Sequence, residues 1–144
     1  MAMLSNYVEN KILDWLLRAQ TYTPVATVYV ALFTAAPTAA GGGTEVSGGA
    51  YARVGVTSAL TAWAGTQSAG STVASTGTGG VTSNNSTINF GTTTASWGTV
   101  TSFALFDAST AGNLIIFGNL TTSLSCPSGA TVSFSAASLT LTLT

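Results

Sequence analysis

The sequence predicts a mainly β protein, an antiparallel jelly-roll-like β-sandwich preceded by one N-terminal α-helix. Apolar residues recur at helical spacing near the N-terminus, whereas short runs rich in β-branched and aromatic residues follow from about residue 25. The 144 residues are enough for one hydrophobic core without disulfides or metals. We therefore expect a single domain over residues 1–144, with a helix within 1–20 and the sandwich over 25–144.

The N-terminal helix is predicted over residues 6–18. Asn6 followed three positions later by Glu9 resembles a capping box, in which the two side chains satisfy free amides at the helix start. The apolar residues at helical spacing are Val8, Ile12, Trp15 and Leu16. Three more widen the stripe: Tyr7, Leu13 and Leu17. We therefore expect the helix to be covered on more than one side, by a sheet or by a neighbouring subunit.

The strands begin with "TVYVALFT" at Thr27, which is apolar on both alternating faces and is predicted to be buried on both. The later candidates are "AYARVGV", "STINF", "WGTVTSFALFD", "NLIIFGNLT" and "TVSFSAASLTLTLT". In the last one the apolar phase slips once, which predicts a bulge or bend at residues 136–138. The side chains expected to be mainly buried are Val28, Val30, Leu32, Phe103, Leu105, Ile115, Phe117, Phe134, Leu139 and Leu141.

A Gly/Ser/Thr-rich insertion is predicted near residues 61–86, where Trp63 is the one aromatic residue. Its composition is that of a loop or flexible segment. An exposed Trp63 there could stack on sugars, so we take it as a candidate partner contact.

The composition excludes several partners. Only 5% of the residues are charged, against roughly 25% in an ordinary domain, and the formal net charge is −1. The three basic residues are spread out, so a nucleic-acid surface is not expected. The longest apolar runs are too short to span a membrane, and the charged N-terminal stretch has no signal-peptide core. The single cysteine, Cys126, is expected to be a buried free thiol.

The chemistry-bearing residues do not form a catalytic set. The chain has no histidine, which removes the usual general base and zinc ligand, so we expect no enzyme activity, no metal, no cofactor and no small-molecule substrate. Asp107 opens the turn "DASTAGN" and is expected to cap its backbone. Glu45 and Arg53 flank "VSGGAYA", and we expect them to form a structural salt bridge, because an unpaired buried arginine would cost several kcal/mol.

Three stretches resemble a family of small tailed-bacteriophage virion proteins, labelled either head decoration (cement) proteins or tail fibre proteins. They are "LSNYVENKILDWLLRAQTYTPVATVYVALFTAAPT", "EVSGGAYARVGV" and "SWGTVTSFALFDASTAGNLIIFGNLT". The resemblance covers most of the chain apart from residues 61–80. It implies a structural protein located in the virion and made in the cytoplasm of the bacterial host.

Two functions are compatible with this resemblance. The first, which we favour from the sequence, is a decoration or cement protein on the head surface that binds the phage major capsid protein. The alternative is a tail fibre or tail-tip module that binds a receptor. Because a surface with so few charges is poorly protected against association, we expect a homo-oligomer, a dimer or a trimer. The candidate contacts are Tyr7, Trp15, Leu17 and Trp63.

Overall fold

The computed structural model describes residues 2–77 and 79–143. Met1, Thr78 and Thr144, which fall in the predicted helix segment, insertion and last strand, lie outside the described residues. The described residues form one helix and ten strands: β1 (Ala2–Leu4), α1 (Asn6–Arg18), β2 (Thr27–Ala35), β3 (Thr44–Glu45), β4 (Val54–Thr57), β5 (Val81–Ser83), β6 (Ile88–Thr92), β7 (Gly98–Phe106), β8 (Leu114–Cys126), β9 (Thr131–Phe134) and β10 (Thr140–Thr142).

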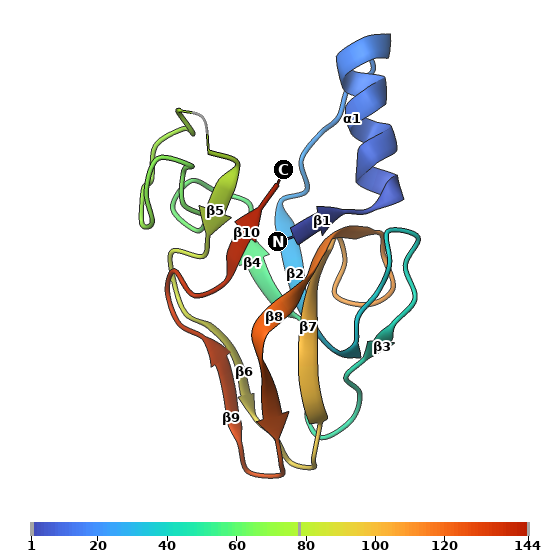
Figure 1. Cartoon of the computed structure of the whole chain (residues 1–144), viewed down its shortest axis with the longest axis vertical. Coiled ribbons are helices and arrows are strands. Elements are labelled where there is room, and N and C mark those ends of the chain that lie inside the picture. The colour runs from blue at the N-terminus through green and yellow to red at the C-terminus, as the bar shows by residue number, and fades with distance from the viewer. Residues whose placement is uncertain (1, 78, 144) are drawn as a thin grey trace.

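A six-stranded sheet is the centre of the fold, with the order β1-β8-β7-β2-β3 and with β4 also paired to β2. Two short sheets, β5 with β10 and β6 with β9, complete the structure, and every strand pair is antiparallel. In Figure 1 the long strands β7 and β8 run through the middle, with β6 and β9 to their lower left and β5 and β10 to their upper left. The prediction of a mainly β, antiparallel protein with one N-terminal helix is confirmed.

The core lies mainly between the large sheet and the two short ones. Along β2, Val30 and Leu32 point into the main cluster, which also contains Ile88 of β6 and Leu141 of β10. The intervening side chains point to the opposite face, where a smaller cluster contains Ala31, Phe33, Ala104, Leu114 and Phe117. This alternation follows from the pleat of a strand and explains why β2 is apolar at every position in its centre.

Seven of the ten side chains predicted to be in the core are buried: Val30, Leu32, Phe103, Leu105, Phe117, Leu139 and Leu141. The other three are half-buried and pack against the main cluster: Val28, Ile115 and Phe134. Cys126 is fully buried, as expected. The change in the apolar alternation predicted a bulge or bend at residues 136–138, and the chain does bend there. A turn in which Ala137 is left-handed (φ 62°) separates β9 from β10. Both halves thereby keep their apolar side chains inside.

Asn84 holds this bend in place. Its Oδ1 accepts a hydrogen bond from the Leu139 amide at 2.9 Å, and its Nδ2 donates to the Ser86 and Ser135 carbonyls at 2.8 Å each. Asn84 lies in the segment that we predicted to be an insertion, but it is almost fully buried. The end of this segment is therefore not a loop throughout, because β5 pairs there with β10.

The helix has the predicted bounds but a different cap. Ser5, rather than Asn6, is the N-cap residue, and its Oγ accepts a hydrogen bond from the Val8 amide at 3.3 Å and donates one to the Leu114 carbonyl. α1 contacts β8 and β1, and Val8 is its one buried side chain among those described. Within one chain the helix is covered on one side, and cover by a neighbouring subunit stays a prediction. No helix among the described residues is long and apolar enough to cross a membrane.

Candidate functional site

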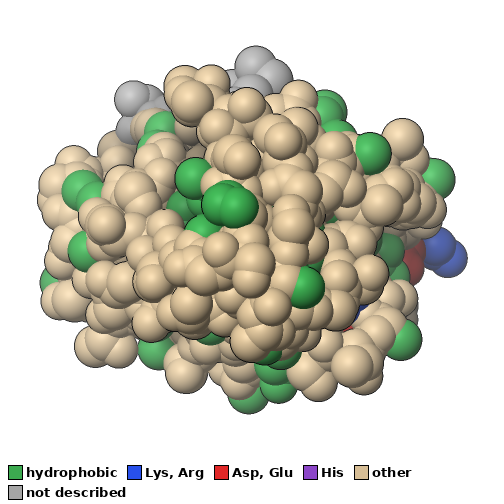
Figure 2. Space-filling view, turned by 90° about the horizontal axis from the view of Figure 1, so that it is seen from below, with side chains coloured by type: hydrophobic (Ala, Val, Ile, Leu, Met, Phe, Trp, Pro, Cys, Tyr) green, Lys and Arg blue, Asp and Glu red, His purple; other side chains and the backbone are tan. Residues whose placement is uncertain are grey.

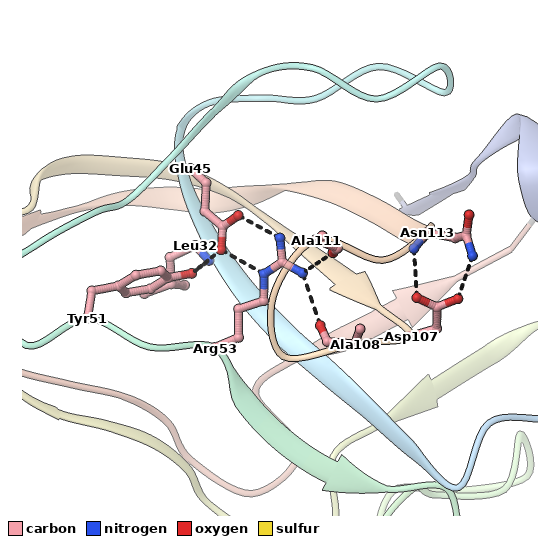
Figure 3. Close-up of polar contacts among 8 residues, drawn as sticks. All are labelled: Leu32, Glu45, Tyr51, Arg53, Asp107, Ala108, Ala111 and Asn113. Atoms are coloured by element: carbon pink, nitrogen blue, oxygen red, sulfur yellow. Dashed lines mark hydrogen bonds and ion pairs between the residues drawn. The ribbon is translucent and has the colours of Figure 1, made fainter.

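The ion pair between Glu45 and Arg53 is the centre of the first region of interest. Glu45 ends β3, and Arg53 directly precedes β4, so both lie beside the same edge of β2. Arg53 donates from Nε to Oε1 and from Nη2 to Oε2, each at 2.8 Å, which is a two-point contact (Figure 3). The Arg53 side chain is 9% exposed and that of Glu45 is 26% exposed. Such bidentate pairs are the strong class of charge-assisted hydrogen bonds.

Arg53 also forms hydrogen bonds with the turn between β7 and β8. Its Nη1 donates to the carbonyls of Ala108 at 3.0 Å and Ala111 at 2.8 Å. Its guanidinium carbon lies 3.6 Å from the centroid of the Phe106 ring, the geometry of a cation–π contact. One side chain therefore joins β3, β4 and a turn more than fifty residues further along the chain.

Tyr51 closes this network on its other side. Its hydroxyl donates a hydrogen bond to Glu45 Oε1 at 2.9 Å and accepts one from the Leu32 amide at 3.0 Å. Leu32 lies in β2 between the residues that pair with β4 and the residues that pair with β3. Its ring meets that of Trp97 edge-on at 5.3 Å, and Trp97 in turn donates from its indole to the Gly49 carbonyl. Burial raises the pKa of the Tyr51 hydroxyl, and the Glu45 carboxylate raises it further, whereas the Leu32 amide and Arg53 oppose the shift.

We call these groups together the Arg53 corner: Glu45, Tyr51, Arg53 and the turn from Ala108 to Ala111. Both oxygens of Glu45 are engaged, and four hydrogen bonds leave the guanidinium. The neighbouring carboxylate, Asp107, accepts from the amide of Asn113 at 2.6 Å and from its side chain at 2.7 Å, which is the expected backbone cap. The charged groups of the corner are therefore bonded within the fold.

A hollow of about 600 Å³ lies next to the Arg53 corner. Its walls come from the Pro- and Gly-rich loop after β2, the start of α1 and the end of the β7–β8 turn, with Tyr7, Phe33 and Phe106 as its aromatic side chains. Polar and apolar groups both line it, and Glu45 and Arg53 form part of the lining.

The candidate contact residues fall in different environments. Trp15 and Leu17 are 59% and 73% exposed in the second half of α1. Tyr7 is half-buried, with the Lys11 ammonium 5.7 Å from its ring. Trp63 is also half-buried and packs against the main core, with a backbone bridge to Asn84, so it is not the freely exposed ring that the sequence suggested.

Two further points concern residues outside the predicted set of contacts. Leu13 and Leu16 are 52% and 64% exposed, so the cover expected for them does not come from the same chain. Tyr51 was not singled out, although it lies two positions before Arg53 and therefore on the same side of an extended segment, which is a usable signal.

The surface carries few charged side chains. In the space-filling view most of the blue and red atoms lie near one margin of the face that is shown (Figure 2).

The chain is mainly β, the charged groups of the Arg53 corner are bonded within the fold, and several large apolar side chains are exposed, which are features of a structural protein. The sequence profile of a family described as "Podophage GP4 fiber I protein gp80" matches residues 3–142. The chain belongs to this family and is a phage virion structural protein. Comparison with curated proteins finds no match. The expected resemblance to tailed-phage virion proteins is confirmed, and the description agrees with the fibre alternative rather than with capsid decoration.

Proposed function

We propose that this protein is a component of a phage tail fibre and that it acts through binding contacts rather than catalysis. The observation that carries the proposal is the match to a fibre family over nearly the whole chain, residues 3–142. The Arg53 corner supports the non-catalytic part, because the Glu45 carboxylate is occupied by Arg53 and Tyr51 and is not free to act as a base or nucleophile.

Capsid decoration, favoured from the sequence, has less support. Low charge and a lack of catalytic residues are equally compatible with a head or a tail protein, whereas the family is described as a fibre protein. Binding to the major capsid protein at the head surface is therefore the second candidate.

The position of the protein in the intact particle distinguishes the two candidates. Particles would be labelled with gold-conjugated antibody against the purified protein and imaged by electron microscopy. We expect label at the tail, and particles without the protein should keep intact heads but adsorb poorly to host cells. A regular array of label over the head, with saturable binding of purified protein to bare heads, would support decoration instead.

The absence of enzyme activity is tested separately. Purified protein would be incubated with polysaccharide extracted from the host surface, and the polymer length would be followed by size-exclusion chromatography. We expect no change in length, and shortening of the polymer would overturn the non-catalytic part of the proposal.

A further inference from the structure

The hollow beside the Arg53 corner has the size and lining of a binding site for a small ring compound. Its volume is about 600 Å³, and ligand sites in proteins usually measure about 300–1,000 Å³. Phe33 and Leu114, two buried residues of the smaller apolar cluster, form part of its lining. The hollow therefore lies over that face of the large sheet and has an apolar inner wall.

Hydrogen bonds fix the walls of the hollow relative to one another. The loop after β2 is closed by Thr38 and Gly41, whose backbone groups exchange two hydrogen bonds at 2.9 and 2.8 Å. The Asn6 amide at the start of α1 donates to the Ala39 carbonyl of this loop at 2.9 Å. The β7–β8 turn is bonded to Arg53. A site whose walls are already bonded loses little conformational freedom when a ligand enters.

Two glycines of the lining lie where a larger residue would not fit. A Cβ at Gly43 would lie 2.7 Å from the Ala35 carbonyl oxygen, and one at Gly112 would lie 2.5 Å from Asp107 Oδ1. Both glycines also have a positive φ, 79° and 77°. The walls they belong to are therefore tightly folded loops rather than loose segments.

Three polar side chains of the lining keep hydrogen-bonding capacity. Asn113 donates from Nδ2 to Asp107 at 2.7 Å, and its Oδ1 points away from Asp107 in Figure 3. The exposed Asn6 carboxamide and the Tyr7 hydroxyl form no side-chain hydrogen bond with any residue that the structure describes. Each carboxamide supplies both donors and an acceptor, and Tyr7 adds a half-buried aromatic ring.

The charges in the lining cancel. Glu45 and Arg53 are its charged residues among those described, and they are bonded to each other at two points, each at 2.8 Å. The Lys11 ammonium lies 5.7 Å from the centroid of the Tyr7 ring, but Lys11 is not part of the lining. An ionic ligand would therefore lose its water in the hollow without gaining a free counter-charge.

We propose that this hollow binds a neutral sugar ring of a host-surface polysaccharide. A sugar ring has C–H faces that pack on an aromatic ring such as that of Tyr7, and hydroxyls that exchange hydrogen bonds with the carboxamides of Asn6 and Asn113. A purely aliphatic ligand would leave these carboxamides without partners. The host-surface origin of the sugar rests on the proposed function, whereas binding in the hollow does not depend on where the protein lies in the particle.

The test is saturation-transfer difference NMR on the purified full chain with the methyl glycosides of glucose, galactose, mannose, rhamnose and N-acetylglucosamine. We expect at least one of these neutral glycosides to bind with a dissociation constant of about 1 mM, the scale for a ligand of this size. Methyl glucuronide and methyl glucosaminide, which are charged, should bind at least about tenfold more weakly than the best neutral glycoside.

Two pairs of variants locate the binding in the hollow. Ala40→Trp places a large ring in the lining from an exposed loop position and should abolish binding, whereas Ala36→Trp, exposed in the same loop but outside the lining, should not. Asn6→Ala should weaken binding about fivefold through the loss of a hydrogen-bonding partner. Its matched control is Asn10→Ala, which changes an exposed asparagine of α1 outside the lining. Unchanged circular dichroism spectra would show that all four variants are folded.

Three outcomes would overturn the proposal. They are the absence of saturation transfer to all five neutral glycosides at about 50 mM, binding that survives Ala40→Trp, and tighter binding of methyl glucuronide than of any neutral glycoside. Antibody label over the head of intact particles would instead overturn the proposed function and leave sugar binding by the isolated chain unaffected, so the two failures are distinguishable.

Discussion

The Arg53 corner and the second half of α1 use polar and apolar side chains in opposite ways. We call the exposed apolar residues of that half of the helix the apolar tip: Leu13, Trp15, Leu16 and Leu17. In the corner, an arginine and a glutamate lie largely inside the protein and are bonded to each other, to a tyrosine and to backbone carbonyls. In the tip, three leucines and a tryptophan lie outside with more than half of their surface exposed. Charge thus connects segments within the chain, whereas the apolar surface of the tip is left uncovered by the chain itself.

This difference teaches that the two regions contribute to separate properties of the molecule. The corner joins segments distant in sequence, so its loss should lower the free energy of unfolding. The tip contacts little of its own chain, so its alteration should leave the fold intact. Substitutions in the corner should therefore destabilise the fold, and substitutions in the tip should not.

The largest effect is expected from Arg53→Met. The substitution removes the charged partner of Glu45, which keeps only the Tyr51 hydroxyl as a donor, and it removes the donor to two backbone carbonyls. Removing one partner of a largely buried pair typically costs about 3 kcal/mol. Urea unfolding followed by circular dichroism measures the loss. The control is Arg18→Met, because Arg18 is 73% exposed and its pair with Asp14 should contribute less than about 0.5 kcal/mol. If the two substitutions lowered the free energy of unfolding equally, the Arg53 corner would contribute no more to stability than an exposed ion pair.

A smaller effect is expected from Tyr51→Phe. The ring remains against Trp97, but the Leu32 amide loses its acceptor and Glu45 loses one donor. An unsatisfied buried amide costs about 1–3 kcal/mol, and thermal or urea unfolding should show a loss in that range. Tyr29→Phe is the matched control, since the Tyr29 hydroxyl makes no hydrogen bond within the described part of the chain. A Tyr51→Phe protein as stable as that control would show that the hydroxyl contributes nothing.

Alkaline pH should weaken the corner through the same hydroxyl. The pKa of Tyr51 is raised in the folded protein, so above its ordinary value of 10.0 the unfolded chain has released a proton that the folded chain retains. Stability is therefore complete below pH 10 and falls as the pH rises, by at most about 1.4 kcal/mol per pH unit. Urea unfolding at pH 9 and 11 should show a steeper loss for the wild type than for Tyr51→Phe. Parallel losses in the two proteins would remove Tyr51 as the cause.

The smallest effect on stability is expected from Leu17→Gln. At 73% exposure this side chain buries little in one chain, so the free energy of unfolding should change by less than about 0.5 kcal/mol when measured at a concentration where the chain is monomeric. A loss above 1 kcal/mol under those conditions would mean that the tip supports the fold of its own chain.

The sequence predicted the elements whose signal is local and repeated. The bounds of α1 follow from helical spacing, and the burial of Val30, Leu32 and Leu105 follows from their position in β-branched and aromatic runs. It also pointed to the partner of Arg53, because a chain with four carboxylates offers few choices. The strands β1, β3 and β5 were missed, since two or three residues are too few to show a period.

The rest depended on contacts that leave no pattern in the sequence. The carbonyls of Ala108 and Ala111 accept from Arg53, but a backbone acceptor is present at every residue and carries no signature. The exposure of Leu13 and Leu16 was also invisible, because helical spacing of apolar residues looks the same whether the cover comes from the same chain or from another. Asn84 was read as part of a polar loop, and its burial follows from the bend that its amide holds.

The three tryptophans lie in different environments, so their fluorescence reports separately on the interior, on the edge of the core and on the helix. Trp97 is 4% exposed beside Tyr51, Trp63 is half-buried over the core, and Trp15 lies 59% exposed on the tip. An indole in water emits at longer wavelength and is more open to a dissolved quencher than one held in a dry interior. In wild-type protein, iodide should therefore quench mainly the long-wavelength part of the emission, and a Trp15→Phe spectrum subtracted from it would isolate the signal of the helix alone.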